Sequence, residues 1–313
     1  MRLRALKIIV GGLLGIVLLA VTAVTFLLRT ETGAGWILDI AQGQIEGFEA
    51  AGHSGSLRGG LDLREFRFSA PGLALQADEI SVAVDMDWFP FVLRLETLGA
   101  RNLVVQTLED ADESAQAGLP GSLELPFRLE APDVRISELR LLDSYGDELF
   151  HARSLTAALT AHREVRLSAF ALDVEQGRLA ATGQLTLLAP FPLELELKAD
   201  LSLPLEEEPE PLVLDVSLDA EGTVEELNLA VNGTIDPPRF QPHSLSTRSR
   251  ISQKGMETSL FELSGPDLVA TGSGAVDWEE SHARLEGLKL TVPGTDLEVT
   301  ADLATDLETE KIE

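Results

Sequence analysis

The sequence predicts a mainly β protein that is tethered to a membrane by one helix at its N-terminus. Two observations carry this prediction. The chain has a long uncharged apolar run close to its N-terminus, and most of the remaining chain places hydrophobic residues at every second position. We therefore expect three parts: a cytoplasmic N-terminus with a transmembrane anchor over residues 1–30, a juxtamembrane amphipathic helix over 31–50, and an elongated β-sheet over 51–313.

The anchor is predicted from residues 8–28, a run of 21 residues without a charge. As a helix it would be about 31 Å long, which matches the hydrocarbon core of a bilayer. Basic residues precede the run and Glu31 follows it, so the positive-inside rule places the N-terminus in the cytoplasm and exports the rest of the chain. The anchor side chains include Ile8, Leu13, Leu14, Val17, Leu18, Val21, Phe26 and Leu28.

A cleaved signal peptide is the alternative interpretation of this run. Val21-Thr22-Ala23 offers small residues of the kind that a signal peptidase prefers. These residues lie inside the apolar run, however, and the run is longer than the roughly 7 to 15 residues of a signal sequence core. A retained anchor is therefore favoured.

Residues 32–47 carry apolar side chains at helical spacing, among them Trp36, Ile37 and Ile40. This pattern predicts a short amphipathic helix just outside the membrane. Because indole rings favour the boundary between lipid and water, we expect Trp36 to lie at the membrane interface.

Beyond this helix the hydrophobic period changes to two. In residues 193–203 Leu and Ala alternate with Glu, Lys, Asp and Ser, so one face of the strand is apolar and the other is charged. The same alternation recurs along the chain. With about 12 residues for each strand and its turn, the exported part of the chain is predicted to hold about 23 strands. A sheet of that many strands is expected to be solenoid-like or taco-shaped.

The apolar side chains that line one face of the predicted sheet have two interpretations. They form a dry core sealed by a second sheet, or they line an open groove for acyl chains. The length of the pattern and a total of only 16 aromatic residues favour the groove. A closed β-sandwich on a membrane stalk and a scaffold that offers sheet edges to client strands remain alternatives. The candidate groove residues are Val82, Val84, Met86, Leu167, Leu185, Leu187, Leu193, Leu195, Leu197, Leu214, Val216, Leu229 and Val231.

Composition argues against several functions. A net charge of -28, from 24 Lys+Arg and 52 Asp+Glu, disfavours nucleic acid as a partner. The absence of Cys excludes disulfides and cysteine nucleophiles, and the five His residues show no metal-ligand spacing. Gly52-His53-Ser54-Gly55-Ser56 lacks the last Gly of a nucleophile elbow. We expect no enzymatic activity, no cofactor and no metal.

Four segments are predicted to be turns or loops. Residues 52–56 are interpreted as a Gly-rich turn, and Asn232-Gly233 as a tight turn. Residues 109–120 and 206–211 are acidic or contain Pro, which is typical of solvated loops.

The order of several short segments resembles the N-terminal part of the TamB family, the inner-membrane component of the translocation and assembly module, which is related to AsmA-like proteins. The segments that carry the resemblance are the anchor, Gly35-Trp36-Ile37-Leu38, Gly55-Ser56-Leu57-Arg58-Gly59-Gly60-Leu61, Val84-Asp85-Met86-Asp87-Trp88-Phe89-Pro90, Leu125-Pro126, Val134-Arg135-Ile136 and repeated G-x-L-x-x-x-G strands such as residues 177–183.

The resemblance implies a long parallel β-taco with an apolar groove that crosses the periplasm of a diderm bacterium. It also implies an inner-membrane location and a role in moving phospholipid through contacts with its acyl chains, in inserting outer-membrane proteins, or in both. An outer-membrane barrel of the TamA or BamA type is the implied protein partner. Family members are typically far longer and end in a distinctive C-terminal domain, so this chain is expected to be a truncated, N-terminal portion.

Overall fold

The computed structural model describes residues 26–89, 91–108, 122–205, 209–238, 241–278, 282–295 and 298–306. Most of the predicted anchor lies outside these residues, as do the whole acidic segment 109–120 and residues 206–208. Phe26 and Leu28 are the described members of the anchor set. Within the described residues, no helix has both the length and the apolar character that crossing a bilayer requires.

The protein is mainly β, with 17 strands assigned to one open sheet, and a closed two-sheet sandwich is therefore not what forms. The strands are β1 (Phe48–Glu49), β2 (Gly52–Ser56), β3 (Gly60–Ala70), β4 (Leu73–Trp88), β5 (Phe91–Thr107), β6 (Arg128–Leu142), β7 (Glu148–Ala161), β8 (Glu164–Val174), β9 (Gly177–Thr186), β10 (Pro192–Leu203), β11 (Leu212–Thr223), β12 (Glu226–Asp236), β13 (His243–Ser252), β14 (Gly255–Ser264), β15 (Val269–Asp277), β16 (His282–Thr291) and β17 (Glu298–Asp306).

The chain divides into two compact units. The N-terminal unit comprises Met1–Gln116 and Leu129–Leu155, and the C-terminal unit comprises Ala117–Arg128 and Thr156–Glu313. The N-terminal unit contains β1 to β5 and nearly all of β6, whereas β8 to β17 belong to the C-terminal unit.

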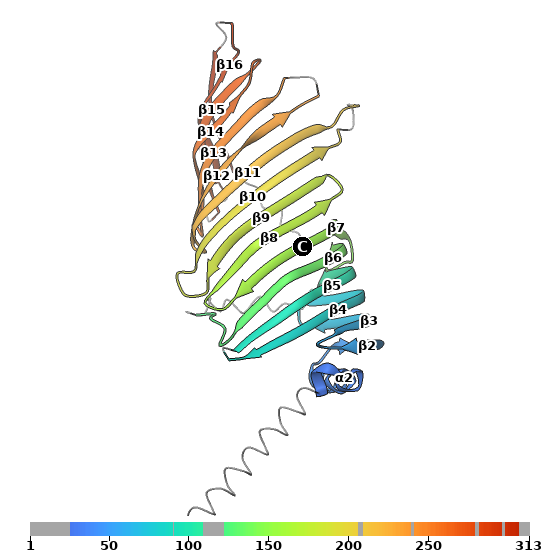
Figure 1. Ribbon diagram of the computed structural model, residues 1–313. Coiled ribbons are helices and arrows are strands. Elements are labelled where there is room, and N and C mark those ends of the chain that lie inside the picture. The colour runs from blue at the N-terminus through green and yellow to red at the C-terminus, as the bar shows by residue number, and fades with distance from the viewer. Residues whose placement is uncertain are drawn as a thin grey trace, which may run out of the picture. The chain divides into compact units, whose positions relative to one another are not determined.

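The helix α2 (Glu31–Gln44) lies beside β2 at the N-terminal end of its unit (Figure 1). Thr30 caps it, because the side-chain oxygen accepts a hydrogen bond from the main-chain N–H of Gly33 at 3.0 Å. Gly33 is required here, since a Cβ atom would lie 2.5 Å from the Cα of Leu27. Ala34 and Leu38 are buried against β3. The helix therefore starts three residues after Leu28, close to the predicted position.

The residues that α2 buries differ from those that its sequence pattern suggests. Ala34 and Leu38 form a core cluster with Leu61 and Leu63. Trp36, in contrast, is 64% exposed. The small Ala34 lets the helix approach the sheet closely, so that Leu38 joins Leu61 and Leu63 in the same core cluster.

In the N-terminal unit β2 to β5 pair antiparallel in chain order, and β1 pairs with β3. β5 and β6 run in the same direction. Arg94 of β5 donates a hydrogen bond to Glu130 of β6, which lies 36 residues later in the chain. The Thr107 hydroxyl of β5 donates to the carbonyl oxygen of Leu142 of β6, which lies 35 residues later. A constant offset is the mark of parallel neighbours, which need a long crossover connection.

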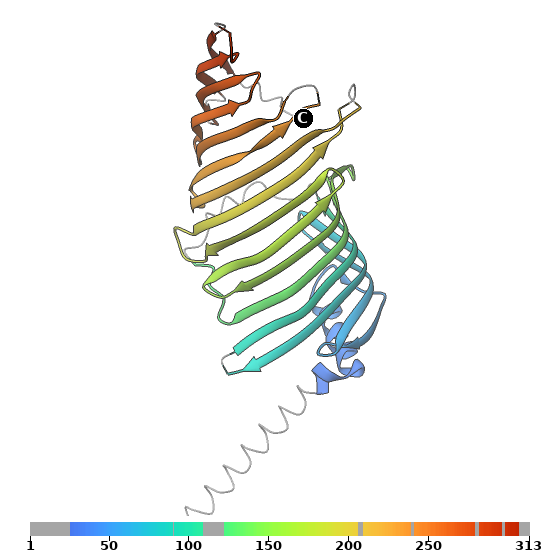
Figure 2. The same cartoon turned by 45° about the horizontal axis from the view of Figure 1, so that its top comes forward.

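In the C-terminal unit, consecutive strands from β8 to β17 pair antiparallel in chain order. Figure 2 shows this succession from green to red. The parallel sheet implied by the resemblance is therefore wrong for these strands, because short turns can join only antiparallel neighbours. Register shifts occur in every pairing from β13 to β17, and such bulges bend a sheet.

Three details of the sequence prediction are corrected. Residues 52–56 form the strand β2 and not a turn, because they pair with β3. Asn232-Gly233 lies within β12, where Gly233 pairs with Val216. Some strands are longer than expected, since β4 has 16 residues and β5 has 17. The described residues therefore contain 17 strands, fewer than the predicted total of about 23.

Candidate functional site

One face of the C-terminal unit is lined by apolar side chains. In β10, Leu195 lies opposite Gly183 on one side and Ala220 on the other, and Ala220 lies opposite Leu229 of β12. Directly opposed residues share a face, and alternate residues of a strand return to it. We call this surface the apolar face; it comprises Val165, Leu167, Phe170, Leu172, Leu179, Leu185, Leu193, Leu195, Leu197, Leu201, Leu212, Leu214, Val216, Leu218, Leu227, Leu229, Val231, Ile235, Leu245, Ile251, Met256, Phe261, Leu263, Val276, Leu285, Leu288, Leu290, Val299 and Leu303.

The register brings most of the predicted groove residues together on this face. Leu185 lies opposite Leu193, Leu201 opposite Leu214, and Val231 opposite Leu218. Leu187 lies just beyond β9 and is buried, with its main-chain N–H donating to the carbonyl oxygen of Arg163 at 2.8 Å. Leu187 therefore helps to hold the strand end, where the chain turns toward Phe191.

The pattern of exposure on the apolar face separates an open surface from a dry core. Small residues of this face are buried, namely Ala181, Ala199, Ala220 and Ala270, and toward the end of β8 Leu172 and Val174 are buried as well. Leu193, Leu195 and Leu197 beside the alanines remain half-exposed. A sealed core buries its large side chains most completely, because they contribute most of the hydrophobic free energy. None of the large side chains in the described residues is fully buried. Within the described residues, the buried alanines lie beside larger, half-exposed side chains of the same face.

Hydroxyl groups interrupt the apolar face at β13 and β14. Ser249 and Thr258 lie opposite each other and are hydrogen-bonded at 2.9 Å, and the Thr247 hydroxyl donates to the carbonyl oxygen of Leu260 at 2.9 Å. The pairing also shifts register here. These polar side chains break the apolar alternation, which is why the sequence prediction stopped at Val231 and missed Leu245, Leu263 and Leu285.

The predicted groove residues of β4 lie on one face of the sheet in the N-terminal unit. Val82, Val84 and Met86 alternate along β4 and lie opposite Leu98, Leu95 and Leu93 of β5. Val82 also packs against the cluster of Leu61, Leu63, Ala34 and Leu38. The helix α2 therefore covers the apolar side of the sheet at this end.

The opposite face of the C-terminal unit is polar, and a hollow of about 970 Å³ lies over it. Along β8 to β13 the bordering side chains share one row of the register: Arg166, Gln184, Glu194, Glu221, Asn228 and Arg250. Leu195 and Leu229 also border the hollow. Because strand residues alternate, their side chains point to the apolar face, and they contribute main chain here. This hollow is therefore not the predicted apolar groove.

Local ion pairs neutralise part of the charge on the polar face. The Lys198 ammonium group lies 2.9 Å from Glu196 on the same strand, and the hydrogen bond that it donates to Glu196, followed by the negative charge of that carboxylate, raises the pKa of Lys198. Arg166 lies 2.7 Å from Glu164, and Arg250 lies 3.4 Å from Glu226. These pairs are exposed, so they set the polarity of the face more than its stability.

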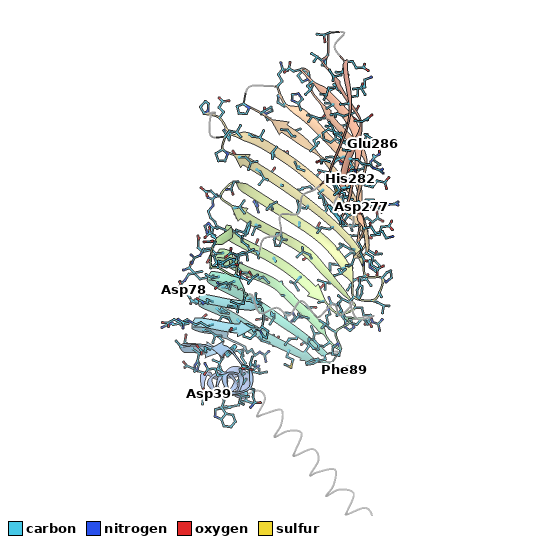
Figure 3. The ribbon with its side chains drawn as sticks, turned by 180° about the vertical axis from the view of Figure 1, so that it is seen from behind. Asp39, Asp78, Phe89, Asp277, His282 and Glu286 are labelled. Carbon is cyan, nitrogen blue, oxygen red and sulfur yellow. The ribbon has the colours of Figure 1, made fainter. Side chains whose placement is uncertain are left out.

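No group of three or more carboxylate and imidazole side chains that could hold a metal ion occurs among the described residues. His243 is buried at the edge of the apolar face, opposite Ile235. His282 lies opposite Asp277 on the polar side of β15 and β16, and both are labelled in Figure 3. The chemistry that the described surface offers is therefore apolar contact on one side and polar contact on the other.

Comparison with known proteins gives one family. The family model described as "TamB, N-terminal domain" matches residues 19–117 and 101–232, which is more than half of the chain. The search of curated proteins found no match. The search of solved structures found none either.

Proposed function

The chain belongs to the TamB family, and on that premise we propose that its apolar face binds the acyl chains of phospholipid. The protein would act as an inner-membrane-anchored periplasmic component of the cell envelope, with the N-terminus in the cytoplasm, and would move phospholipid toward the outer membrane. It would carry no enzymatic activity. An outer-membrane barrel of the TamA or BamA type is the protein partner that the proposal includes.

The half-exposed Leu and Val side chains of the apolar face carry this proposal. An acyl chain laid against them removes apolar surface of both molecules from water, which stabilises the complex by roughly 0.8 kcal/mol per buried CH₂ group. Such binding needs no polar recognition site. The polar face belongs to the same strands but lacks the apolar side chains. Phospholipid binding at residues of the polar face can therefore be compared with binding at residues of the apolar face.

Photocrosslinking tests the proposal. We would incorporate a photoreactive residue at Leu195, Val216 or Leu229 in the full chain in cells and analyse the adducts for phospholipid. Glu196 and Asp215 are matched controls, because each directly adjoins one of these positions in its strand and points to the other face. We expect phospholipid adducts from the first set alone. Equal labelling of both sets would refute acyl-chain binding by the apolar face.

A second candidate function, a scaffold for outer-membrane protein assembly, is favoured by β17. This strand pairs with β16, and its apolar residues Val299 and Leu303 are 48% and 58% exposed. Exposed apolar side chains that alternate along a strand suit pairing with an incoming client strand. Crosslinks from Val299 to nascent outer-membrane proteins, without lipid adducts at Leu195, would favour this function over lipid transport.

A further inference from the structure

The hairpin of β4 and β5 extends beyond the strands that precede it. β3 pairs with β4 from Ala70 opposite Leu73 to Leu61 opposite Val82. The pairing of β4 with β5 continues to Trp88 opposite Phe91. The hairpin therefore projects past the start of β3 by six residues of β4 and seven residues of β5, or about 20 Å.

The tip of this hairpin is aromatic and faces solvent. Phe89 is 99% exposed and Phe91 is 41% exposed. Figure 3 labels Phe89 at the tip. Exposed aromatic residues that are gathered at one point of a surface indicate contact with an apolar partner.

Three contacts place the base of the projection beside the end of the predicted anchor. The main-chain N–H of Arg58 donates to the carbonyl oxygen of Leu28 at 2.8 Å. The Arg58 guanidinium pairs with Asp85 at 3.1 Å, and the N–H of Val84 donates to the carbonyl oxygen of Leu57 at 2.6 Å. Phe89 is four residues beyond Asp85, which is about 13 Å along an extended strand.

Other large apolar residues are exposed around the same point of the N-terminal unit. Phe26 is 53% exposed, and α2 exposes Trp36 and Ile40 at 64% and 57%. The helix begins three residues after Leu28, and the hairpin is joined to Leu28 through Arg58. Both elements therefore emerge from the place where the anchor ends.

The acidic groups nearest the tip are paired with arginines. Asp85 pairs with Arg58, and Asp87 lies 3.7 Å from the Arg94 guanidinium. The tip therefore presents aromatic rings without an unpaired carboxylate from β4, although the chain as a whole is strongly acidic. This arrangement permits approach to a lipid surface that carries negative charge.

We propose that the tip of the β4–β5 hairpin, through Phe89 and Phe91, inserts into the surface of the bilayer that holds the anchor. It is a second lipid contact beside α2, and it fixes the orientation of the N-terminal unit on the membrane. The inference rests on the membrane anchoring in the proposed function, but it does not depend on lipid binding by the apolar face.

Site-specific fluorescence tests this contact, and the absence of native Cys makes single labelling direct. The full chain carrying Phe89→Cys would be labelled with nitrobenzoxadiazole and reconstituted into phosphatidylethanolamine and phosphatidylglycerol vesicles, with or without bromine on the acyl chains. Tyr145→Cys is the matched control. Tyr145 is an aromatic residue of the same unit, 78% exposed, in the turn between β6 and β7. That turn adjoins the opposite end of β5, since Thr107 bonds to Leu142.

Because interfacial groups sit roughly 5–10 Å into the boundary of headgroups and acyl chains, brominated lipid should reduce the emission at position 89 by about twofold and leave position 145 unchanged. Equal quenching at the two positions, or none at position 89, would overturn the proposal. A blue shift of the probe at position 89 in native membranes but not in the lipid vesicles would assign the tip to a protein partner and would also overturn it. A probe attached to Trp36→Cys reports whether the segment that follows the anchor lies at the membrane interface of the same vesicles.

Discussion

A Cβ atom on Gly233 would lie 2.2 Å from the carbonyl oxygen of Asp215 on the neighbouring strand. The two strands approach so closely here that any side chain must push β11 and β12 apart. We predict that Gly233→Ala lowers the free energy of unfolding by about 1–3 kcal/mol, the usual cost of overpacking. Denaturant unfolding of the full chain in detergent, followed by circular dichroism, measures this loss.

Gly52→Ala is the control for that substitution. Gly52 also lies in a strand, but no atom would come within 4 Å of its Cβ. The free energy of unfolding of the Gly52→Ala variant is expected to stay within about 0.5 kcal/mol of that of the parent protein. Equal losses for the two variants would show that the close approach of β11 and β12 is not the cause.

Leu38 is the largest side chain that α2 buries, and we predict that Leu38→Ala loosens the helix from the sheet. The cavity should cost about 2–4 kcal/mol, since the transfer free energy and the packing are both lost. Faster proteolytic cleavage within α2 measures the loosening. Ile40→Ala removes an exposed side chain of the same helix and should leave the cleavage rate unchanged.

The third prediction concerns Arg94, which lies 2.9 Å from Glu130. The hydrogen bond to Glu130 and then its negative charge raise the pKa of Arg94 above its ordinary value. A group whose pKa is raised on folding stabilises the fold fully below its unfolded value and loses that contribution only above it. Arg94→Gln should therefore lower the melting temperature equally at neutral and at mildly alkaline pH. A loss that shrinks between these two conditions would contradict this assignment.

The fourth prediction tests the two faces of β10 against each other. Leu197 and Lys198 are adjacent, and they lie opposite Leu218 and Ser217 of β11. If acyl chains lie on the apolar face, Leu197→Glu should weaken phospholipid binding about tenfold, because losing contact with about two CH₂ groups costs roughly 1.4 kcal/mol. Lys198→Glu should bind normally. Binding of fluorescent phospholipid to the purified full chain measures both, and equal affinities would contradict the prediction.

Much of the fold could be predicted from local pattern. The alternation of residues 193–203 required a strand with one apolar face, and β10 has that form. The apolar pattern of residues 32–47 predicted a helix after the apolar run, and α2 (Glu31–Gln44) starts one residue before that range and ends three residues before its end. The sequence also resembled the TamB family through the order of its short segments, and the family match agrees.

The errors came from positions where local signals are ambiguous. Gly is common in turns, but Gly233 lies in β12 and residues 52–56 form β2. Neighbouring backbone approaches Gly233 and Gly55 closely, and Gly fits such contacts within a strand. Thr247, Ser249 and Thr258 hid the continuation of the apolar face, since hydroxyls that bond to each other or to backbone fit a sheet without looking apolar. The aromatic hairpin tip was visible only as a family segment, because exposure is not encoded in a short run of residues.

The sequence by itself determined that this chain alternates apolar and charged residues, since strand geometry sends successive side chains to opposite faces. It also determined the position of α2 after the apolar run. The tertiary structure decided which strands are neighbours, that those of the C-terminal unit run antiparallel, and that small Ala residues are buried while Leu residues beside them stay half-exposed. These properties depend on backbone pairing between segments that are distant in the sequence. A local pattern does not specify which side chains stay exposed after the strands have paired.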